Sequence, residues 1–156
     1  MTKDDVERHI DLAFAGEAMP RTERELCEPG IEAPYVIEHF LGRARDDVHA
    51  ASFRPSLHME DFTYMTRAAV AYYLPPVLKL VLREPLGFEL WTHLSGFLRS
   101  ARHASADNLR DLTSSQLAAI ADCLAFLADE RDGSFGFKAK DARKLATLYR
   151  ELAATR

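Results

Sequence analysis

Apolar side chains recur at intervals of three and four residues along most of this 156-residue chain. This spacing places them on one face of an α-helix, because a helix turns once every 3.6 residues. The clearest stripe follows Thr113. It consists of Leu117, Ile120, Ala121, Leu124, Leu127 and Ala128. Such helices must bury their stripes against one another, so the pattern predicts an all-α protein.

The amino-acid composition favours the same fold class. The chain has 23 Ala and 20 Leu but only 10 Val and Ile together, so strong helix formers outnumber the residues that strands prefer. The length is typical of one domain, since domains usually contain about 100–200 residues. We therefore expect residues 1–156 to form a single helical domain, built as a compact bundle or orthogonal array of about six helices.

Capping residues and breakers indicate where several helices begin and end. Thr2 and Asp5 have the spacing of a capping box, and Gly16 supplies a stop. Thr22 and Glu25 could open a short helical turn, and Pro34 suits the first position of another helix. Further helices are predicted over residues 86–98, over 113–128 and from 139 onward, with loop over 99–112.

Prolines interrupt two other segments. Pro75 and Pro76 cannot occupy a helix interior cheaply, so we expect one helix to end near Tyr73 and a second to start at Pro75 or Pro76. Pro55 argues against a long helix over 43–62, which we predict to be mostly loop. Pro85 is predicted to separate the helix before it from the helix after it, and a turn is predicted at 132–133.

Charge is distributed unevenly along the chain. The formal net charge is −4; residues 1–62 carry 7 basic and 14 acidic side chains, whereas residues 63–156 carry 13 and 10. This balance gives no general attraction to nucleic acid, and we expect the basic cluster over 138–144 to be a solvated helix face. The acidic half is interpreted first as solvated helix faces, and alternatively as a surface for a basic partner.

The sequence predicts a reduced, cytoplasmic protein. No run approaches the roughly 18–20 apolar residues that a bilayer span needs, and the acidic start does not resemble an export signal. The two cysteines, Cys27 and Cys123, are too few for a disulfide framework or a Cys₄ metal site.

Patterns typical of catalysis or metal binding are absent from the sequence. The six histidines are at least nine residues apart, so no two have the spacing of a helical metal pair. No Gly-x-Ser-x-Gly or phosphate-binding loop occurs. We expect no cofactor, no metal and no catalytic residues; whether the chain is an enzyme stays open, with a non-enzymatic role favoured.

The best candidate for a ligand pocket lies beside the two prolines. Tyr72, Tyr73, Trp91 and His93 supply aromatic faces and polar ends, and a helix break there would free backbone groups for a ligand. This pocket supports one hypothesis, a small-ligand binder or enzyme. The favoured hypothesis is a non-enzymatic protein–protein interaction module. The sequence does not determine the oligomeric state.

Three sequence patterns resemble a family of small uncharacterised bacterial proteins that carry a domain of unknown function. They are Ile10-Asp11-Leu12-Ala13-Phe14, the central Tyr72-Tyr73-Leu74-Pro75, and a later pattern formed by Leu112, Thr113, Gln116 and Ile120. The likeness covers roughly residues 8–130. It departs from the family at residues 41–45, where an expected tryptophan is missing. The resemblance implies a helical fold and a bacterial source but no activity.

Overall fold

The computed structural model describes residues 1–83, 88–131 and 137–156. The helix break predicted at Pro85 and the turn predicted at 132–133 lie outside these residues. The described α-helices are α1 (Lys3–Ala13), α2 (Glu23–Leu26), α3 (Ala33–Phe40), α4 (Pro55–Asp61), α5 (Arg67–Arg83), α6 (Phe88–Arg99), α7 (Asp107–Arg110), α8 (Ser114–Glu130) and α9 (Ala139–Ala154). The described residues also include short 3₁₀ helices: η1 (Arg45–Asp47), η2 (Phe62–Tyr64) and η3 (Ser100–Arg102).

The all-α prediction is confirmed for the described residues. Their α-helices number nine rather than about six. Part of the difference comes from α2 and α7, which have four residues each. Such short helices cannot present a repeated apolar stripe, so periodicity underestimates their number. Among the described residues, extended pairing is limited to one antiparallel bridge between Cys27 and Met65.

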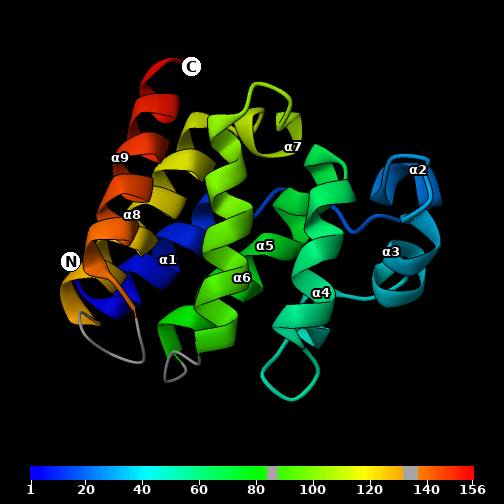
Figure 1. Cartoon of the computed structure of the whole chain (residues 1–156), viewed down its shortest axis with the longest axis horizontal. Helices are drawn as coiled ribbons and strands as arrows, with labels where there is room; N and C mark the ends of the chain where they lie inside the picture. The colour runs from blue at the N-terminus through cyan, green and yellow to red at the C-terminus, as the bar shows by residue number, and fades with distance from the viewer. Residues whose placement is uncertain (84–87, 132–136) are drawn as a thin grey trace.

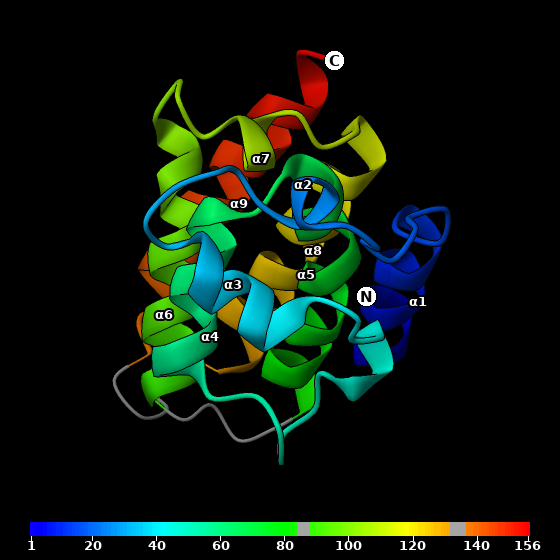
Figure 2. The same ribbon diagram turned by 90° about the vertical axis from the view of Figure 1, so that its right-hand side faces the viewer.

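Helix α5 occupies the middle of the molecule in both views (Figures 1 and 2). The antiparallel helices α8 and α9 lie on one side of it, and α2 and α3 lie on the other. α8 also packs on α1, and α4 packs on α6. The buried apolar side chains form one cluster that draws on all of these layers, from Val6 in α1 to Tyr149 in α9.

The predicted break at Pro75 and Pro76 is wrong, because α5 runs through both prolines. Neither residue can donate to the carbonyl four positions earlier, at a cost of about 3 kcal/mol for a proline in a helix interior. The continuous helix fully buries Leu74, Val77, Leu78, Val81 and Leu82. Each such side chain contributes about 1.5–3 kcal/mol, so burial outweighs the lost hydrogen bonds.

The prediction that residues 43–62 are mostly loop is wrong in its second half. Pro55 starts α4 instead of preventing it, because the first helical position needs no amide hydrogen. This places His58, Met59 and Asp61 on a buried helix face. The predicted loop over 99–112 likewise contains η3 and α7.

None of the described helices combines the length and the apolar character that a membrane crossing requires.

Candidate functional site

The structure brings Tyr72 and Tyr73 together but uses both hydroxyls internally. Their rings meet edge to face with centroids 4.9 Å apart. The Tyr73 hydroxyl shares its single hydrogen between the carbonyls of Phe40 and Arg43, at 2.8 and 2.7 Å, and burial raises its pKa to about 12. The Tyr72 hydroxyl accepts from the backbone amide of Arg45 at 3.1 Å. These tyrosines therefore attach the segment after α3 to the central helix.

Trp91 and His93 lie in different surroundings from the tyrosines. Trp91 is buried and packs edge to face on Phe137, with centroids 4.7 Å apart. His93 is half-buried and lines a hollow between α4 and α6. The four predicted residues thus do not line one common hollow among those described below.

Two adjoining hollows form a groove that involves α4, η2, α6, η3 and α7. The larger has a volume of about 510 Å³, and the smaller about 300 Å³. Thr63 and Ser100 line both hollows, so the two lie side by side. The larger is lined by Glu28, Thr63, Met65, Thr66, Arg67, Ser100, His103, Ser105, Ala106, Asp107 and Asn108. The smaller is lined by Ser56, Met59, Glu60, Thr63, His93, Gly96, Phe97 and Ser100.

The groove is acidic. Glu28, Glu60 and Asp107 are exposed, and none of the salt bridges found in the described residues involves them. The negative charges of Glu28 and Glu60 act on neighbouring titratable groups. Burial, and then Glu23 and Glu28, raise the pKa of the Cys27 thiol; burial, and then Glu32 and Glu60, raise the pKa of Tyr64.

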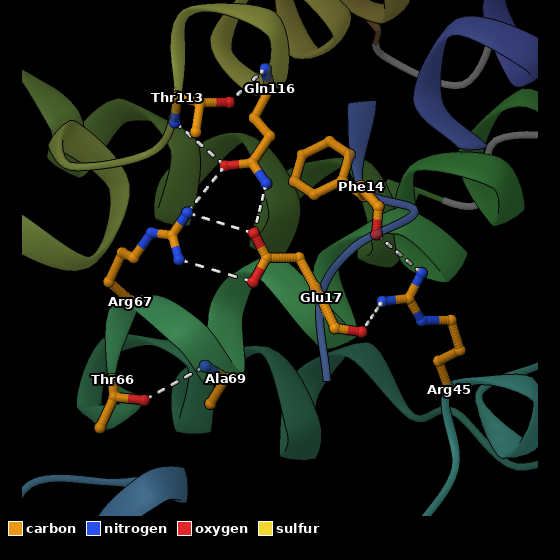
Figure 3. Close-up of polar contacts among 8 residues, drawn as sticks. All are labelled: Phe14, Glu17, Arg45, Thr66, Arg67, Ala69, Thr113 and Gln116. Carbon is orange, nitrogen blue, oxygen red and sulfur yellow. Dashed lines mark hydrogen bonds and ion pairs between the residues drawn. The ribbon is translucent and has the colours of Figure 1, made fainter. Parts of the chain in front are cut away.

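The groove's arginine, Arg67, is neutralised by a polar network (Figure 3). Its guanidinium contacts the Glu17 carboxylate at 3.1 and 3.5 Å and the Gln116 side-chain oxygen at 3.3 Å. Gln116 donates to Glu17 at 2.6 Å and accepts from the Thr113 amide in the capping box of α8. The network joins the segment after α1, the start of α5 and the start of α8. In the described ranges, none of the three groove carboxylates makes an ion pair with this arginine or with another cation.

A histidine cluster lies between α3, which supplies the half-buried His39, and α4, which supplies the buried His58 and Asp61. His39 Nδ1 is 2.6 Å from an Asp61 carboxylate oxygen, and the rings of His39 and His58 meet edge to face at 5.2 Å. His58 Nδ1 accepts from the Arg54 amide at 2.9 Å. Burial, with positive charge nearby, lowers the pKa of His58 to about 4. Burial raises the pKa of Asp61, against the effect of the His39 hydrogen bond.

Sequence reasoning missed both the histidine cluster and the groove. His58 and Asp61 have i, i+3 spacing, a signal that becomes readable only once Pro55 is taken as a helix start. The cluster offers no metal centre: in the described ranges no three His, Cys, Asp or Glu side chains are grouped so as to hold an ion.

Comparison of the chain with protein-family models, curated proteins and solved structures finds no match.

Proposed function

We propose that the protein is a non-enzymatic protein–protein interaction module whose groove receives a segment of a basic partner. The observation that carries the proposal is the acidic groove formed by the two adjoining hollows. A ligand pocket at Tyr72, Tyr73 and Trp91 has less support, because both tyrosine hydroxyls are engaged by backbone groups.

The shape and lining of the groove support a polypeptide segment as the occupant. Its two parts together involve five elements, and its lining mixes hydroxyl groups with apolar side chains such as Met59 and Phe97. An extended peptide needs such a combination, because its backbone requires polar partners and its side chains require apolar contact.

Charge complementarity indicates a basic segment. Three unpaired carboxylates at exposed positions attract Lys and Arg side chains, and they repel an acidic chain. The net charge of residues 1–62 has the same sign as the groove. A bacterial source and a cytoplasmic location stay predictions that accompany this proposal.

Peptide binding measured by fluorescence anisotropy tests the proposal. The probe is a labelled ten-residue peptide with alternating Arg and Ala, compared with a peptide of the same length that has Glu in place of Arg. We expect the basic peptide to bind and its affinity to fall as salt rises. Glu60→Gln together with Asp107→Asn should weaken binding about tenfold, since each exposed charge pair is worth up to about 1 kcal/mol.

Glu151→Gln together with Asp4→Asn is the matched control, because it also removes two carboxylate charges, from exposed positions on α9 and α1. It should leave the affinity nearly unchanged. Chemical-shift mapping should place the peptide at Thr63 and Ser100, where the two hollows meet. Equal binding of both peptides, or equal loss in the control, would overturn the proposal.

A further inference from the structure

A separate cleft lies at the two prolines of α5. It has a volume of about 200 Å³ and is bounded by α1, η1 with the residues after it, and α5. This volume is below the 300–1,000 Å³ typical of pockets for drug-sized ligands, so it suits a small metabolite. One wall is apolar and consists of Val48, Pro75, Pro76 and Leu80.

Two of the cations that line the cleft are already neutralised. Lys79 Nζ is 2.6 Å from Asp11, and Arg83 makes a two-pronged contact with Glu7 at 2.8 and 2.6 Å. These pairs join α1 to α5 and form part of the cleft's rim. Lys79 and Arg83 therefore already have counter-ions within the protein.

Arg45 differs from these two residues. Among the residues that the structure describes, no carboxylate lies within 4.0 Å of its guanidinium. The guanidinium reaches only the carbonyls of Phe14 and Glu17, at 3.4 and 3.5 Å (Figure 3). These are long contacts for a charged donor, whose hydrogen bonds to oxygen are usually about 2.7–2.9 Å. A half-buried cation is thus left with weak neutral acceptors.

Tyr72 holds Arg45 in place. The guanidinium lies over the tyrosine ring, 4.4 Å from its centroid, while the hydroxyl accepts from the Arg45 amide. A cation stacked in this way keeps its edge donors available. Tyr72, singled out from the sequence as a ligand residue, is therefore a positioning residue for Arg45.

The cleft also contains one unpaired anion. Asp46 is exposed, and no salt bridge between described residues involves it. Among the described residues that line the cleft, Arg45 and Asp46 thus remain without an ion pair beside an apolar wall, with the exposed His49 also in the lining. We infer that the cleft binds a small zwitterion of the α-amino-acid class. The ligand's carboxylate pairs with Arg45, its ammonium with Asp46, and its aliphatic side chain packs on Pro75 and Pro76.

Isothermal titration calorimetry with neutral L-amino acids (valine, leucine, methionine and proline) tests the inference. At least one should bind, and removing either charge from it should weaken binding about tenfold or more. For leucine, the analogues are 4-methylpentanoate, which lacks the ammonium, and 3-methylbutylamine, which lacks the carboxylate. Absence of heat from all four amino acids at millimolar concentration would overturn the inference, as would equal affinity for the single-charge analogues.

Variants locate the binding site. Arg45→Gln and Asp46→Asn should each weaken binding about tenfold, whereas Arg150→Gln, at an exposed position on α9, should not. Because Asp46 is exposed, Asp46→Asn is expected to fold normally even where Arg45→Gln does not. Unchanged affinity in Asp46→Asn would refute the zwitterion assignment. Because the cleft and the groove share no lining residue, failure here is distinguishable from failure of the peptide experiment.

Discussion

Mild acid should destabilise this protein through His58. The side chain is 7% exposed, and its Nδ1 accepts a backbone hydrogen bond, which requires the unprotonated nitrogen. The surrounding charges are His39, Arg43 and Arg54, and they disfavour a further positive charge; Asp61 pairs with His39. The folded protein therefore holds His58 neutral.

The size of the effect follows from the two pKa values. The ordinary value is 6.5, and the folded protein lowers it to about 4. At a pH between these values, His58 binds a proton in the unfolded chain but not in the folded one. The contribution of neutral His58 to the free energy of unfolding is therefore fully present above pH 6.5 and falls as the pH drops toward 4. The full difference corresponds to about 3 kcal/mol, of which about 2 kcal/mol is lost by pH 5.

Urea unfolding between pH 8 and pH 5 measures this loss. His58→Asn keeps an acceptor for the Arg54 amide but cannot be protonated. Between pH 8 and pH 5, the wild type should therefore lose about 2 kcal/mol more free energy of unfolding than this variant. His103→Gln removes an exposed histidine and should reproduce the wild-type curve. If His58→Asn and the wild type lose stability in parallel, the account of a buried neutral histidine is wrong.

Three further outcomes are expected. Tyr73→Phe should lower the free energy of unfolding by about 1–3 kcal/mol in urea titrations, because two backbone carbonyls lose a buried donor. Gln116→Ala should cost about 1–3 kcal/mol in the same assay, because it removes the side-chain half of the α8 capping box and a donor to Glu17, whereas the exposed Thr147→Ala should stay within about 0.5 kcal/mol of wild type. Burial raises the pKa of the fully buried Cys123 thiol, so it should react with a disulfide reagent only after unfolding; rapid labelling of Cys123 in a native Cys27→Ser variant would contradict its position in the core.

Features that depend on near neighbours were predictable from the sequence. The capping box at Thr2, the short helix after Thr22 and the helix that follows Thr113 are confirmed, because a helix cap joins residues only three positions apart. The stripe that follows Thr113 is buried as its spacing predicted. The all-α class follows from the same local rules, since periodicity within one helix decides which face is apolar.

Features that depend on distant residues were decided by the tertiary structure. The path of α5 through Pro75 and Pro76 is set by burial against other helices, which exceeds the local penalty. His39 meets Asp61 across 22 positions, and Glu17 meets Gln116 across 99. The charges left free in the groove and in the cleft are likewise known only after such pairs have formed. A sequence shows which groups can ionise or bury themselves, whereas packing determines which of them find partners.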